Sequence, residues 1–241
     1  MQSPPYEEFG ASLKNYFNNT TLSDATIRCE GRYFSVHSLI LFCHSEYFRK
    51  QLDGPWKESS ERVIDILDFN PPIVEAMTLF LYCFDYESPA DSSAMMFHAK
   101  VYQIADKYGV EALKRLSATK FRASIDENWK TDDFPAAIAL AYTTTPPEDR
   151  GLRDITVQVA FNNIGTLMSR VAFCETLSDN PDLAADIIRF MHGKWEQLEE
   201  YKCSSCERVF LIGTVTTKTG DSPFIFHRYC PGCQARNTSR R

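Results

Sequence analysis

The sequence predicts an α+β protein in which a small sheet packs against helices and a second, cysteine-rich β module follows near the C-terminus. Three observations carry this prediction. Short segments of alternating apolar and polar residues lie between residues 25 and 66, apolar residues at helical spacing recur across residues 70–201, and four cysteines form two C-x-x-C pairs after residue 202. Alternation with a period of two marks half-buried strands, whereas spacings of three and four mark one face of a helix.

The first strands come from residues 25–29 and 33–36, where apolar residues alternate with polar ones. Glu30-Gly31 between them can supply the turn of a hairpin. The apolar run 39–52 predicts buried helices packed on this hairpin, and residues 63–66 predict a third strand.

The following helices are marked by their ends. Asn70 before two prolines predicts a helix start, and the apolar stripe then continues to Phe84. A helix from about Ala94 is ended by Gly109, which suits a left-handed position, and residues 110–121 predict another helix. Residues 124–131 are expected to be a junction. The later helices are predicted over residues 134–142, 151–162, 171–177 and 182–201, with a two-proline loop at 143–150.

In this order and spacing, the motifs over residues 21–123 resemble a BTB/POZ domain. The motifs are SDATI, GRYFSVHSLIL, SEYFRKQL, VIDI, PPIVEAMTLFLYCFDY and VYQIADKYGVEALKRL. The arrangement resembles most the BTB proteins of filamentous fungi. The resemblance implies a BTB/POZ fold, a small sheet flanked by a helical bundle. The expected parts are an N-terminal tail and short helix at 1–20, the BTB/POZ domain at 21–123, a helical extension at 124–201, and a zinc-ribbon-like module with a basic tail at 202–241.

Four cysteines predict a metal centre. Cys203 and Cys206 form CSSC, Cys230 and Cys233 form CPGC, and 23 residues separate the pairs. Zinc prefers four tetrahedral ligands, and four thiolates leave no open position for a substrate, so we expect a structural Zn²⁺. Residues 209–217 and 223–229 are expected to pair as a hairpin, which resembles a zinc ribbon.

Other readings of the cysteines are weaker. Two local disulfides are disfavoured in a reducing compartment, and a thioredoxin-like redox site needs one C-x-x-C in a βαβ setting. His227 is surplus to the four thiolates and is expected to be a strand residue. The remaining cysteines fall in apolar patterns and are interpreted as buried core residues: Cys29, Cys43, Cys83 and Cys174.

The composition, charge and motifs of the chain argue against several classes of function. The chain has 241 residues and a formal net charge of −6, which argues against a chain-wide nucleic-acid surface. No apolar run approaches the roughly 20 residues that span a bilayer. The acidic first residues lack the apolar stretch of a signal peptide, so an intracellular location is expected, in the nucleus or the cytoplasm. No phosphate loop, dinucleotide fingerprint or nucleophile elbow is present, and His37 matches a structural position of the BTB/POZ fold, so an enzyme is not expected.

The resemblance implies a protein-interaction adaptor that recruits substrates to a ubiquitin ligase built on a cullin-3-type scaffold. Cullin-binding members carry an apolar residue, any residue and then glutamate in one loop, and Trp56 and Glu58 match that motif position for position. The alternative is a nuclear or transcriptional regulator whose zinc ribbon contacts nucleic acid or a protein partner.

A short helix is predicted over residues 6–18, with Leu13, Tyr16 and Phe17 on or near one face. In the BTB family a helix here can pack against a second protomer, so these three residues are candidates for a homodimer interface. The equally weighted alternative is that the helix covers an edge of its own domain.

Overall fold

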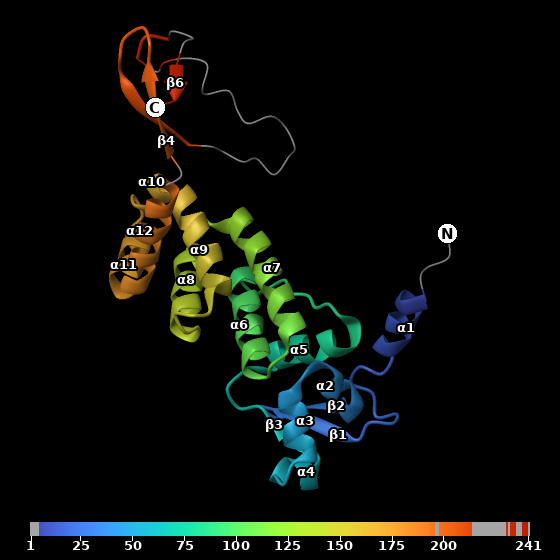
Figure 1. Ribbon diagram of the computed structural model, residues 1–241. Helices are drawn as coiled ribbons and strands as arrows, with labels where there is room; N and C mark the ends of the chain where they lie inside the picture. The colour runs from blue at the N-terminus through green and yellow to red at the C-terminus, as the bar shows by residue number, and fades with distance from the viewer. Residues whose placement is uncertain (1–4, 196–197, 214–229, 231, 235–237, 241) are drawn as a thin grey trace.

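The computed structural model describes residues 5–195, 198–213, 230, 232–234 and 238–240. A three-stranded sheet lies at one end, a succession of helices follows, and a second three-stranded sheet lies beyond the last helix (Figure 1).

The first sheet has the strand order β2-β1-β3. β1 (Ala25–Cys29) and β2 (Arg32–Val36) are antiparallel and are joined by Glu30 and Gly31, both with positive φ. Positive φ at both central residues is the conformation that a two-residue hairpin turn requires, as predicted. β3 (Val63–Asp65) pairs parallel to β1. The predicted alternation holds, because the side chains of Ala25, Ile27 and Cys29 are all buried.

Helices cover this sheet. Ile27, Phe34, Leu41 and Phe48 belong to one apolar core and are each no more than 1% exposed. Burying a side chain of this size stabilises the fold by roughly 1.5–3 kcal/mol. The helices of this part are α1 (Pro5–Lys14), α2 (Ser38–His44), α3 (Glu46–Asp53), α4 (Lys57–Glu61), α5 (Pro71–Cys83), α6 (Ala94–Lys107) and α7 (Glu111–Asn128).

One detail of these helices confirms the prediction and another differs from it. Asn70 is the N-cap of α5, as predicted, and its backbone oxygen, not its side chain, accepts the N–H of Ile73 at 3.1 Å. Phe84 was expected on the buried stripe of the same helix. It is instead the C-cap, with a left-handed backbone that turns its side chain outward, and 54% of it is exposed.

A second apolar core lies among the later helices. These are α8 (Asp133–Thr144), α9 (Arg150–Asn162), α10 (Ile164–Leu167), α11 (Val171–Asp179) and α12 (Pro181–Trp195). Met95, Ala99 and Tyr102 of α6 also belong to this core, as do Phe121 and Ile125 of α7. The two cores therefore share α6 and α7.

The predicted junction at residues 124–131 is wrong for most of its length. α7 continues to Asn128, because Ile125 is fully buried in the second core and Ser124 is also buried. Only Trp129 to Asp132 link α7 to α8, so a helix crosses the expected boundary between residues 123 and 124.

The second sheet has the order β5-β4-β6, formed by β4 (Leu198–Cys203), β5 (Val209–Gly213) and β6 (Thr238–Arg240). The predicted last helix to Tyr201 is therefore too long, since α12 ends at Trp195 and Leu198 begins a strand. β4 is paired on both sides, and these hydrogen bonds replace those that a longer helix would have made. Residues 223–229, expected as a hairpin strand and containing His227, lie outside the described residues.

Candidate interaction loop and metal centre

The loop between α3 and β3 displays the first candidate site. α3 ends at Asp53, and after Gly54 and Pro55 the chain reaches Trp56, which is the N-cap residue of the short helix α4. The indole of Trp56 is 61% exposed. An indole that faces water leaves a large apolar area exposed to solvent, which is a common property of interface anchors.

Gly54 allows the position of this indole. A Cβ atom at residue 54 would lie 2.8 Å from Cδ1 and 2.9 Å from Nε1 of Trp56, and 2.4 Å from the backbone oxygen of Lys50. The ring therefore lies against the bare backbone of Gly54, which only glycine permits. This contact is visible only in the structure, because the sequence indicates only a turn.

Glu58 lies on α4 and is half-buried. Gln51 Nε2 of α3 approaches Glu58 Oε1 at 3.5 Å, a long hydrogen bond. The two motif residues thus differ in setting, since Trp56 faces solvent and Glu58 leans toward its own domain.

Arg62 is a residue of this loop that sequence reasoning missed. It is the C-cap of α4, has a left-handed backbone with φ of 57°, and donates its backbone N–H to Glu58 O at 2.8 Å. Its guanidinium reaches Asp24 at the start of β1. No local pattern marks an arginine for such a position, so only the tertiary structure reveals it.

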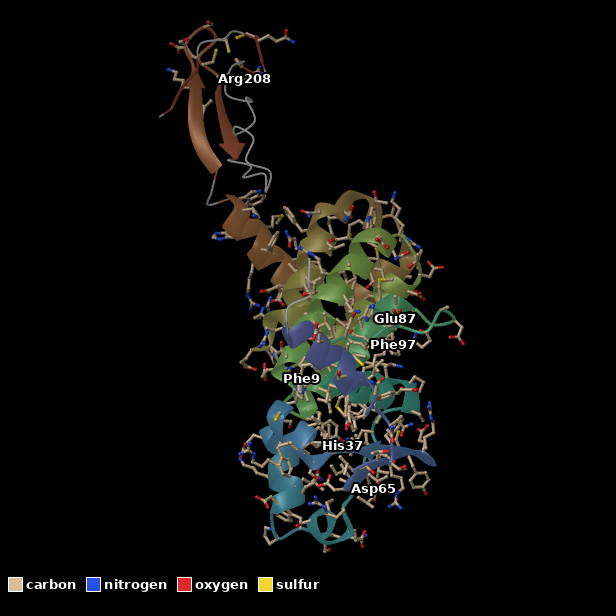
Figure 2. The ribbon with its side chains drawn as sticks, turned by 90° about the vertical axis from the view of Figure 1, so that its right-hand side faces the viewer. Phe9, His37, Asp65, Glu87, Phe97 and Arg208 are labelled. Atoms are coloured by element: carbon tan, nitrogen blue, oxygen red, sulfur yellow. The ribbon has the colours of Figure 1, made fainter. Side chains whose placement is uncertain are left out.

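His37 and Asp24 have structural partners. The His37 ring contacts Tyr82 Oη at 2.8 Å through Nδ1 and Thr21 O at 2.9 Å through Nε2, immediately before α2 (Figure 2). Asp24 Oδ1 accepts the backbone N–H of Ser38 at 2.7 Å. Burial by itself would raise the pKa of Asp24, but the hydrogen bond from Ser38 and the nearby Arg62 outweigh it and lower the pKa. These contacts are those of fold-stabilising residues.

The three candidates for a dimer interface lie in or just after α1. Leu13 and Phe17 are half-buried and pack against the first core of their own chain, with the Phe17 and Tyr82 ring centroids 6.1 Å apart. Tyr16 is 39% exposed and meets the His37 ring edge-on. Of the three, Tyr16 therefore presents the most surface to a second protomer, and the homodimer stays a prediction.

The four predicted metal ligands come together. The sulfurs of Cys203, Cys206, Cys230 and Cys233 all lie within 4.8 Å of one another. Cys203 and Cys233 sulfurs are 3.6 Å apart, as are those of Cys206 and Cys230. Tetrahedral Zn–S bonds of about 2.3 Å would place sulfurs about 3.8 Å apart. The cluster could therefore hold a metal ion of that size.

Backbone amides prepare these sulfurs to be thiolates. Ser205 N–H points at Cys203 Sγ at 3.4 Å, and Gly232 N–H points at Cys230 Sγ at 3.3 Å. The amide of Cys206, with that of Ser205, lowers the pKa of Cys203 to about 6. Burial would raise the pKa of Cys230, but the amides of Cys233 and Gly232 outweigh it and lower the pKa. Thiolate is the form that binds metal.

The interpretation of the other cysteines as core residues is only partly right. Cys29 is buried and its thiol donates to Phe69 O at 2.9 Å. Cys83 and Cys174 are half-buried, and Cys43 is exposed because it lies on the outer face of α2. Because the residues before Cys43 are nearly all apolar, the sequence does not show which face of the helix Cys43 lies on.

Comparisons with known proteins address the first part of the chain. Residues 13–125 match the family model described as the BTB/POZ domain. The chain is 30% identical over 163 residues to BTB and MATH domain-containing protein 40 of Caenorhabditis elegans, covering 67% of this chain and 38% of that protein. It is 31% identical over 77 residues to Kelch-like protein 8 of Mus musculus, covering 32% of this chain and 12% of that protein.

Among solved structures, the BTB domain of human gigaxonin matches with a TM-score of 0.38 and 19% identity, over 48% of this chain and 92% of that one.

The chain spans less than two fifths of the length of either curated relative named above. Residues 13–125 are a BTB/POZ domain, which is a protein-interaction domain rather than a catalytic one. No helix in the described part of the chain is long and apolar enough to cross a membrane.

Proposed function

We propose that this chain, with a BTB/POZ domain over residues 13–125, is an adaptor that joins a substrate protein to a cullin-3-type ubiquitin-ligase scaffold. One observation supports this most directly. Trp56 stands 61% exposed in the loop where cullin-binding BTB domains carry an apolar residue, and Glu58 follows at the required spacing.

The chemistry of the loop suits docking. Covering the indole of Trp56 removes a large apolar area from water, which is the main contribution expected of an anchor. Glu58 keeps carboxylate oxygens available because its contact with Gln51 is long. A partner donor can therefore replace or share that contact at the rim of the interface.

The test is a binding measurement between the full chain and the N-terminal region of a cullin-3-type scaffold. Trp56→Ala should weaken binding by about 2 kcal/mol or more, as expected of a central anchor, and Glu58→Ala should weaken it less. Lys57→Ala is the matched control, because Lys57 stands between the two and its ammonium pairs with the exposed Glu61. Leu67→Ala controls for loss of an exposed apolar side chain, since Leu67 is 80% exposed elsewhere on the domain.

Two results would remove the ligase-adaptor function. One is undetectable binding by the wild-type chain, and the other is equal binding by the wild type and both motif variants. Either would leave a BTB/POZ interaction module with another partner.

The four-cysteine cluster is proposed to bind Zn²⁺ in a structural role. The supporting observation is that four sulfurs lie within 4.8 Å of one another, two of the pairs at 3.6 Å, with amide donors that favour thiolates. With four protein ligands the ion has no open position, so its contribution is to hold β4 and β5 to the second cysteine pair.

A further inference from the structure

One side chain, that of Arg62, fixes the loop that carries Trp56 to the rest of the domain. Arg62 Nη1 donates to Leu52 O in the last turn of α3 at 3.3 Å, and Arg62 Nε donates to Asp24 O at 3.0 Å. Its Nη2 donates to Asp24 Oδ2 at 2.7 Å and to Ser38 Oγ at 2.8 Å. One guanidinium therefore joins the end of α3, the start of β1 and the start of α2.

The backbone of Arg62 also helps to fix this loop. Its left-handed conformation is unfavourable for a residue other than glycine, so surrounding contacts must maintain it. The backbone N–H of Arg62 donates to Glu58 O at 2.8 Å, and Ser59 N–H donates to Trp56 O at 3.2 Å. The same residue thus ends α4 and anchors the loop to the domain.

We propose that Arg62 is the positioning residue of the Trp56–Glu58 surface. Its guanidinium fixes the segment from Leu52 to Arg62, so the indole is already directed outward when a partner arrives. A loop ordered beforehand loses less entropy on binding, and the saving appears as affinity. The role of Arg62 in affinity rests on the proposed cullin-binding function, whereas its role in ordering the loop does not.

Hydrogen exchange on the full chain without a partner tests the ordering. Arg62→Asn removes the guanidinium, while asparagine tolerates the left-handed backbone. The amides of Ser59 and of position 62 should exchange about tenfold faster, as expected when a local opening becomes easier. Arg28→Gln is the matched control, because the Arg28 guanidinium makes a two-point ion pair with Asp65 across the same sheet.

Binding to the cullin region tests the consequence. Arg62→Asn should weaken binding about tenfold, and in the Trp56→Ala background it should weaken it much less, because the two changes act on one surface. Equal loop exchange in the wild type and Arg62→Asn overturns the proposal. Faster loop exchange with no binding by the wild type sinks the ligase-adaptor function and leaves the ordering role intact.

Arg62→Lys is a second, milder variant that keeps the test valid if Arg62→Asn does not fold. Lysine keeps a charge near Asp24 but lacks the planar fork needed to reach Leu52 O and Asp24 together. It should raise loop exchange in the same direction by a smaller factor, and unchanged exchange in this folded variant overturns the proposal.

Discussion

At the residue scale, a buried carboxylate holds helices of the extension together. Asp186 of α12 is 5% exposed and accepts hydrogen bonds from Tyr142 Oη at 2.9 Å and Arg150 Nη1 at 2.8 Å. Burial by itself would raise the pKa of Asp186, but the hydrogen bonds from Arg150 and Tyr142 outweigh it and lower the pKa. One carboxylate therefore joins α8, α9 and α12.

This lowered pKa predicts an acid dependence of stability. A carboxyl whose folded pKa lies below its unfolded value of about 3.9 stabilises the fold fully above that value. The stabilisation is lost as pH falls through the folded pKa. Asp186→Asn should lower the free energy of unfolding by about 1–3 kcal/mol at neutral pH and flatten its decline in acid.

Urea titrations at a series of pH values measure both effects. Asp154→Asn is the control, because the side chain of Asp154 is 64% exposed and pairs with the same Arg150, and exposed pairs contribute about 0–1 kcal/mol. A steeper acid decline in Asp186→Asn than in the wild type would contradict the assignment.

At the element scale, we predict that the folding of the cysteine module depends on a bound metal ion. The second sheet has short strands, and a unit of this size cannot bury enough apolar area to fold by itself. Cys230→Ser should therefore release the ion and unfold β4 to β6, while the first core keeps its structure because it lies in other elements. Metal analysis of protein purified without chelator should give one zinc per chain, and its absence would refute the assignment.

Elements with strong local signals could be predicted from sequence. The hairpin of β1 and β2 followed from alternation and Glu30-Gly31, and the end of α6 followed from Gly109, whose φ is +63°. The length of α7 and the start of β4 could not, because the burial of Ile125 and the two-sided pairing of β4 are tertiary effects. Such effects override local propensity.

The candidate sites also contain features that could be predicted from local sequence and features that depend on tertiary contacts. The four-cysteine cluster could be predicted, because each C-x-x-C turn brings two sulfurs close together. The motif of Trp56 could be found, but its support by Gly54 and Arg62 could not, because Arg62 bonds to residues that are distant in sequence.

At the scale of the whole molecule, the BTB/POZ domain and the helical extension are not independent bodies. α6 and α7 contribute side chains to both cores, and Tyr102 Oη of α6 donates to Asp149 just before α9 at 2.5 Å. Removing the extension would expose apolar side chains that are each worth roughly 1.5–3 kcal/mol when buried.

A fragment of residues 1–128 should therefore be less stable than one of residues 1–195 and should bind a hydrophobic dye. The longer fragment is the control, since it lacks only the cysteine module. Calorimetry on residues 1–195 should show a single transition. Two separate transitions, or equal melting temperatures for the two fragments, would contradict the shared core.

Self-association through the region around α1 is the remaining prediction at this scale. Light scattering at micromolar concentration should detect a dimer in which Tyr16 contacts the second protomer across a two-fold axis. Tyr16→Ala should shift the chain toward monomer. A strictly monomeric wild type, unchanged by deletion of residues 1–19, would count against this interface.

The parallel pairing of β1 with β3 has a consequence for how the chain is made. Arg28 and Asp65, partners across these strands, are 37 residues apart, so the ribosome delivers them a few seconds apart at about 5–20 residues per second. During that interval one edge of β1 is open, and an open edge is a template for wrong pairing. Pairing with β3 then covers this edge of β1. Arg62, which is synthesised immediately before β3, bonds to Asp24 next to β1 and helps to hold the pair together.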